Sequence, residues 1–151
     1  RSSTSPANFS SSSIGTLAEI TAKGGCLVLG VGPTPQGLIE APAVEILEEI
    51  GDWLGRCGEA IYSTRTARNY NDGKLWFTAS KDARTIYAVY ALEDGEALPA
   101  SLSWSGNLPV GKVTVLNTGK KVRATVKDGR VTVKLPRGMK AEPVALRFGV
   151  Q

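Results

Sequence analysis

The chain has 151 residues, about the length of one domain, with 42% hydrophobic residues and a net charge of +4. It contains no histidine, which excludes a Ser-His-Asp or Cys-His catalyst and removes the commonest metal ligand. Its basic residues are scattered rather than gathered in a stripe, and no apolar run approaches the roughly 20 residues that span a bilayer. We therefore expect no metal and no nucleic-acid or membrane partner.

The first segment, residues 1–15, is rich in serine and poor in large apolar side chains. Such a segment buries too little apolar surface to offset the entropy lost on ordering, so we expect a disordered arm. A short helix should follow over residues 16–23, with Thr16 and Glu19 as a capping box. Gly24 and the next glycine should end this helix.

The apolar run from Cys26 to Val31 predicts a strand buried on both faces, because it lacks the alternation of a half-exposed strand. A loop rich in Gly and Pro comes next. It lacks the third glycine and the immediate helix of a dinucleotide-binding fingerprint. Residues 43–54 then predict an amphipathic helix, since apolar side chains recur on one face. We interpret the carboxylates on its other face as solvated; they are Glu45, Glu48, Glu49 and Asp52.

From Ile61 onward the apolar period changes to two, which is typical of strands. The Asp128-Gly129 pair predicts a two-residue type I′ hairpin. Short strands separated by turn signals, with no helix between them, favour an antiparallel β-sandwich of Greek-key type over residues 61–151. The predicted strands are Leu75–Ala79, Thr85–Ala91, Ser101–Trp104, Lys112–Leu116, Lys121–Lys127, Arg130–Leu135 and Pro143–Phe148.

Aromatic side chains are the residues in this part that could bind a ligand. Three tryptophans and four tyrosines could stack against sugar rings, or they could form the core between two sheets. For Trp104 the sequence pattern decides least between sugar binding and core packing, because this residue stands at the end of a strand. The acidic residues beside turns (Asp72, Asp82, Asp94 and Asp128) fit turn chemistry better than catalysis.

An ordered set of residues between Gly24 and Arg65 resembles a known family. The set comprises Gly24-Gly25, Leu27, Leu29, Gly32-Pro33, Gly37, Ile39, Ile50-Gly51, Trp53-Leu54, Gly58 to Tyr62 and Thr64-Arg65. It is similar to the closing segment of the catalytic barrel in the α-L-fucosidases of glycoside hydrolase family 29. Two segments of the strand-rich part, Trp104 to Asn107 and Val131 to Pro136, also resemble the C-terminal sandwich of that family.

The resemblance implies that residues 16–60 are a strand-helix remnant of a (β/α) barrel in front of the sandwich. The parent protein would be an α-L-fucosidase that hydrolyses fucosides with retention, without a cofactor. The catalytic carboxylates of the family lie upstream of the matched segment, so we expect no catalytic residue here. Implied partners are the parent barrel and, through it, fucosylated glycans. The family implies a secreted, periplasmic or lysosomal parent, whereas the residues themselves indicate no compartment or oligomeric state.

The two cysteines depart from the family pattern. Cys26 and Cys57 each stand where the family usually has asparagine, as does Gly30. This coincidence implies a Cys26–Cys57 disulfide; the alternative is two free, buried thiols. For the sandwich itself, two roles stay open: structural support of the barrel, which we favour, or a carbohydrate-binding module that uses exposed aromatics such as Trp104.

Overall fold

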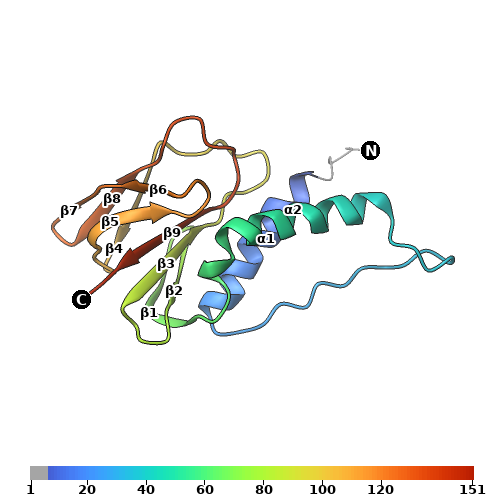
Figure 1. The fold of residues 1–151 in the computed structure, drawn as a ribbon, viewed down its shortest axis with the longest axis horizontal. Coiled ribbons are helices and arrows are strands. Elements are labelled where there is room, and N and C mark those ends of the chain that lie inside the picture. Colours follow the sequence, from blue (N-terminus) through green and yellow to red (C-terminus); the bar gives the residue numbers. More distant parts are fainter. Residues whose placement is uncertain (1–6) are drawn as a thin grey trace.

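The computed structural model describes residues 7–151 as two helices laid on one side of a β-sandwich (Figure 1). Helix α1 (Ala7–Ala22) and helix α2 (Ala41–Cys57) are joined by an extended segment, and a short 3₁₀ turn, η1 (Gly58–Ala60), follows α2. The strands are β1 (Arg65–Asp72), β2 (Leu75–Ala79), β3 (Thr85–Tyr90), β4 (Ser101–Ser105), β5 (Val110–Val115), β6 (Lys120–Val122), β7 (Ala124–Lys127), β8 (Arg130–Lys134) and β9 (Val144–Gly149). Within these residues no helix is long and apolar enough to cross a membrane.

Two antiparallel sheets make up the sandwich, as the sequence predicts. One has six strands in the order β1-β2-β3-β9-β5-β6, and the other has three in the order β4-β8-β7. All strand pairs are antiparallel. Because β9 lies between β3 and β5, the last strand of the chain ties the two halves of the larger sheet together.

The space between the sheets is filled by aromatic and branched side chains. Trp104 on β4 is fully buried and packs between Phe77 and Phe148, at centroid distances of 5.9 and 5.5 Å. Val131 and Val133 on β8 alternate into the same core, as expected for a strand with one buried face. This core therefore belongs wholly to the sandwich.

A second apolar cluster joins the helices to the outer face of the larger sheet. Ile14 and Ala18 of α1 and Trp53 of α2 pack with Val89 on β3 and Ala145 on β9. The two central strands are thus buried on both faces, since their alternate residues enter the core between the sheets. The helices are therefore an integral layer of the fold.

Helix α1 corrects the expected disordered arm. Residues 7–15 are helical, because Ile14 and Ala18, four positions apart, bury one face of the helix against α2 and the sheet. Thr16 is not a cap; it lies inside the helix, where its Oγ1 donates to the carbonyl of Ser12 at 2.9 Å. Residues 1–6, the rest of the expected arm, lie outside the described residues.

The expected buried strand at residues 26–31 is also wrong. This segment is extended and exposed, with Val28 91% accessible, and the chain returns through an isolated bridge between Pro33 and Ile39. An apolar run becomes a strand only beside a partner strand, and nothing in residues 7–151 pairs with it. Figure 1 shows the segment running away from the sandwich before α2 returns.

Most strand predictions are confirmed, with two differences. The predicted strand over residues 121–127 divides at Arg123, where the chain passes from the larger sheet (β6) to the smaller one (β7). The sequence pattern does not predict strand β1 (Arg65–Asp72). The Asp128-Gly129 hairpin is confirmed, because both residues have positive φ, 52° and 76°, and join β7 to β8.

Candidate functional site

The structure gives Trp104 no access to a ligand. Its ring is fully buried between the sheets, and its indole N–H donates to the carbonyl of Asn107 at 3.2 Å. A ring in this position cannot stack on a sugar, so of the two roles left open for Trp104 the structure supports core packing. The core interpretation of the aromatics holds for this residue and for Trp53.

The two cysteines do not form a disulfide. Cys26 is exposed in the extended segment, whereas Cys57 is completely buried at the end of α2, next to Trp53 and Ala60. Burial raises the pKa of the Cys57 thiol to about 12. The predicted pairing fails because one side chain points into the helix–sheet cluster while the other lies in a segment outside it.

The acidic face of α2 is solvated, as its spacing predicts. Glu45, Glu48 and Asp52 are exposed, and Asp52 pairs with Arg56 one turn on, at 3.1 Å. Glu49 is turned toward α1 and accepts a hydrogen bond from Ser10 at 2.5 Å. These four carboxylates therefore do not face one another as a catalytic pair.

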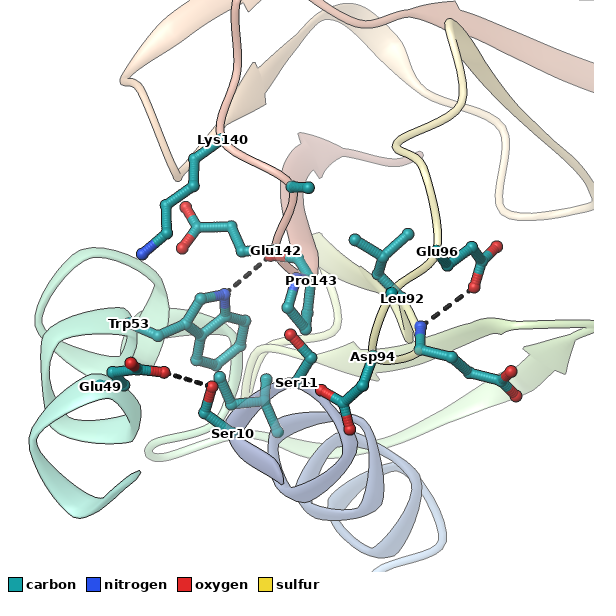
Figure 2. Close-up of a pocket in the computed structure, with 14 residues that line it drawn as sticks. Ser10, Ser11, Glu49, Trp53, Leu92, Asp94, Glu96, Lys140, Glu142 and Pro143 are labelled. Carbon is teal, nitrogen blue, oxygen red and sulfur yellow. Dashed lines mark hydrogen bonds between the residues drawn. The ribbon is translucent and has the colours of Figure 1, made fainter. Parts of the chain in front are cut away.

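A hollow of about 370 Å³ lies where the two helices meet the loops before β4 and β9 (Figure 2). Several carboxylates gather in this hollow around Trp53. Its lining includes Ser10, Glu49, Trp53, Asp94, Glu96 and Glu142.

A clamp of polar contacts forms one wall of this hollow. The indole N–H of Trp53 donates to the carbonyl of Pro143 at 2.8 Å (Figure 2). The Arg56 guanidinium contacts both oxygens of Glu142, at 2.5 and 2.9 Å. The Asn117 side chain donates to Glu142 and to Pro143 and accepts from the backbone N–H of Ala145. These groups fasten the end of α2 to the start of β9.

The clamp sets the charge of Glu142. Burial opposes ionisation, but hydrogen bonds from Arg56 and Asn117 outweigh it and hold the pKa of Glu142 below its ordinary value. A catalytic acid needs the opposite shift, a raised pKa that keeps it protonated near neutral pH. Glu142 is therefore suited to a permanent ion pair.

The opposite wall is held in the same way. Glu96 accepts from Lys74 at 2.6 Å and from Tyr90 at 3.0 Å, and the hydrogen bond from Lys74 lowers the pKa of Glu96. Asp94 accepts a hydrogen bond from Ser12 of α1 through Oδ2, while its Oδ1 is buried without a partner among the described residues. The hollow thus has the character of a joint between elements, because Glu49, Glu96 and Glu142 are each held by a partner from another part of the chain.

No group of three or more His, Cys, Asp or Glu side chains comes together as metal ligands within residues 7–151. The partners of the clamp lie far apart in sequence: Arg56 and Glu142 are 86 positions apart. Sequence reasoning missed this cluster because no local pattern marks either residue. The local sign of a buried polar contact is the charged Glu142, which stands just before the apolar strand β9.

Comparison with known proteins agrees with the resemblance in the sequence. The family model described as Alpha-L-fucosidase matches residues 3–59. The plasma α-L-fucosidase of Rattus norvegicus is 33% identical over 80% of this chain, and the α-L-fucosidase of Branchiostoma floridae is 32% identical over 80%. The match covers 27% of each of these two proteins, so the chain spans about a quarter of their length.

Solved structures give the same picture. The α-fucosidase of Thermotoga maritima in complex with a mechanism-based inhibitor superposes with a TM-score of 0.76 at 25% identity, over 93% of this chain and 34% of that one. A family 29 α-L-fucosidase from Bacteroides thetaiotaomicron, trapped as a covalent intermediate, shares the fold with a TM-score of 0.78 at 21% identity, over 94% of this chain and 32% of that one. The chain is therefore a homologue of the α-L-fucosidases of glycoside hydrolase family 29.

Proposed function

We propose that this chain is the part of an α-L-fucosidase that completes the catalytic barrel and supports it with a β-sandwich. The complete protein would hydrolyse terminal α-L-fucosides with retention, using carboxylates that lie outside these residues. Its partners would be the barrel in the same protein and the fucosylated glycans that the barrel binds. The observation that carries the proposal is the exposed apolar segment ahead of α2.

This segment has the composition of a buried strand and the exposure of a loop. Val28, Leu29 and Val31 are 91%, 49% and 40% accessible, and Leu38 and Ile39 follow at 67% and 43%. Soluble proteins seldom leave such a run of apolar side chains uncovered unless another surface covers it. A neighbouring barrel strand would pair with its backbone and bury both faces, which explains why the run lacks alternation.

The clamp supports the structural role of the sandwich. Trp53 and Arg56 fasten α2 to the loop before β9, and the same helix leads back to the exposed segment. A barrel packed on this segment and on α2 would thereby be held to the sandwich through a rigid joint. The homologues from Rattus norvegicus and Branchiostoma floridae support the assignment, since both are α-L-fucosidases.

Activity measurements test the proposal. The purified chain should not hydrolyse a chromogenic α-L-fucoside, and turnover above background would overturn the idea that the catalytic groups lie elsewhere. In a longer protein that carries this chain behind a barrel, Val28→Asp should abolish fucosidase activity, because it would place a charge in a buried strand. Full activity of that variant would contradict the proposed position of the segment.

A further inference from the structure

A polar hollow on the sandwich, lined by no residue of α1 or α2, has features that the support role does not require. Its volume is about 610 Å³, and it is lined by residues 68–72 of β1, by Ser105 at the end of β4 and by Gly106 after it. The second of these segments belongs to the Trp-Ser-Gly-Asn motif that the sequence singles out.

Strand β1 carries a bulge at this place. It pairs with β2 at Arg65 and Thr66, and again at Asn71 and Asp72, but the register shifts between these two stretches. The residues in between leave the ladder, and three consecutive side chains face solvent: Arg68, Asn69 and Tyr70. Bulges at sheet edges commonly redirect side chains next to functional sites.

The loop after β4 packs against this bulge with two consecutive residues at positive φ. Gly106 and Asn107 have φ values of +76° and +42°. A Cβ at Gly106 would lie 2.8 Å from Nδ2 of Asn69. The Asn107 side chain donates to the carbonyl of Asn69 at 2.9 Å, and Asp72 accepts from the backbone N–H of Ser105 at 2.8 Å. A non-glycine residue at positive φ is strain that tends to persist at functional sites.

Several polar groups around the hollow remain available. The side chains of Arg68 and Asn69 make no hydrogen bond or ion pair with residues 7–151, and Oδ1 of Asp72 accepts none from them. Tyr70 is 47% exposed on the same lining. The hollow therefore offers donors, an acceptor and an aromatic ring together.

We propose that this hollow binds a neutral glycan. A sugar presents hydroxyl groups that both donate and accept, which suits the mixture of Arg68, Asn69 and Asp72. Its C–H face can pack on the amphipathic ring of Tyr70. The free carboxylate oxygen of Asp72 disfavours an anion such as phosphate, and Arg68 disfavours a cation. This inference does not depend on the proposed role of the exposed segment.

Ligand-observed NMR on the purified chain tests the site, with methyl α-L-fucopyranoside and lactose as probes. Saturation transfer to at least one probe is expected. Tyr70→Ala and Arg68→Ala should each weaken that binding by about tenfold or more, whereas Tyr70→Phe should keep it. The matched control is Tyr62→Ala, which removes a tyrosine that is 60% exposed outside the hollow.

Three results would overturn the inference: neither probe binds the unaltered chain, Tyr70→Ala binds as well as the unaltered chain, or Tyr62→Ala weakens binding as much as Tyr70→Ala. Thermal melting of each variant shows whether the fold is intact. Because Arg68 and Tyr70 are exposed, their melting temperatures should stay close to that of the unaltered chain. The absence of fucosidase turnover, which the proposed function expects, is unaffected by any of these outcomes.

Discussion

The indole N–H of Trp53 donates to the backbone carbonyl of Pro143, ninety positions along the chain, at 2.8 Å. The ring is 1% exposed and sits between α1, α2 and the larger sheet. This contact joins the helical layer to the strand at the centre of the sandwich. Substitutions in the clamp around it therefore test how strongly the helices are fastened to the sandwich.

Trp53→Phe should lower the free energy of unfolding by about 1–2 kcal/mol, as measured by urea denaturation. The loss is modest because Asn117 still donates to the Pro143 carbonyl at 2.9 Å, so that oxygen keeps a partner. Trp53→Ala should cost about 3–5 kcal/mol, since it also opens a cavity. Trp76→Phe is the control, because Trp76 is only partly buried. An equal loss of stability for Trp53→Phe and Trp76→Phe would show that the hydrogen bond from Trp53 to Pro143 does not stabilise the fold.

The ion pair between Arg56 and Glu142 predicts a pH dependence. The folded state holds the pKa of Glu142 below its ordinary value of 4.5. The pair therefore contributes its full stability above that value, and the contribution is lost as the pH falls through the lower, folded pKa. Arg56 stays protonated throughout this range. Glu142→Gln should remove this part of the pH dependence of unfolding below pH 4.5.

At neutral pH, Glu142→Gln should also cost about 1–3 kcal/mol, because it leaves Arg56 without its charged partner. The control is Glu59→Gln. Glu59 pairs with Arg147 at 2.8 Å, but both side chains are well exposed, so its loss should cost less than about 1 kcal/mol. If the two substitutions cost the same, the clamp is no stronger than a surface pair.

The two thiols should react very differently with Ellman's reagent. Cys26 is exposed, whereas burial raises the pKa of Cys57 to about 12, which leaves almost no thiolate near pH 8. We expect one fast-reacting thiol per folded chain and two after denaturation, with or without prior reduction. Cys26→Ser should abolish the fast reaction and Cys57→Ser should not. If no thiol reacted before reduction, the Cys26–Cys57 disulfide would be present after all.

The exposed segment predicts an unusual tolerance to charge. Val28→Asp should change the free energy of unfolding of this chain by less than about 0.5 kcal/mol, because the side chain contacts almost nothing. Val133→Asp is the matched control: the same substitution at a fully buried position should unfold the protein or cost several kcal/mol. Circular dichroism during thermal melting measures both. A large loss for Val28→Asp would mean that the segment is packed in solution.

The sequence predicts those parts of the fold that local patterns determine. Leu75–Ala79 is a short apolar run flanked by turn residues, and the structure gives the strand the same limits. The Asp128-Gly129 turn follows from the positive φ that a type I′ hairpin requires. The helix around Trp53 follows from its apolar face, although it extends to Cys57, beyond the predicted end.

Where long-range contacts decide, local patterns fail. Ser10 to Ser13 reads as a flexible arm, but Ile14 and Ala18 order the helix through contacts with α2 and β3. Cys26 to Val31 reads as a strand, but a strand needs a partner that residues 7–151 do not provide. For Trp104 the sequence leaves two roles open, sugar binding and core packing. Its packing against Phe148, which local sequence does not reveal, shows that it belongs to the core.

Two glycines with equal space around them should respond to alanine in opposite ways. Gly51 lies within α2 and Gly129 in the β7–β8 turn, and a Cβ at either would meet nothing within 4 Å. Gly51→Ala should raise the free energy of unfolding by about 0.5–1 kcal/mol, since alanine favours the helix and restricts the unfolded chain. Gly129→Ala should lower it by about 1–2 kcal/mol, because the φ of +76° disfavours any residue with a Cβ. Urea denaturation of both variants measures the difference, and the same sign for both would show that backbone conformation is not what distinguishes these sites.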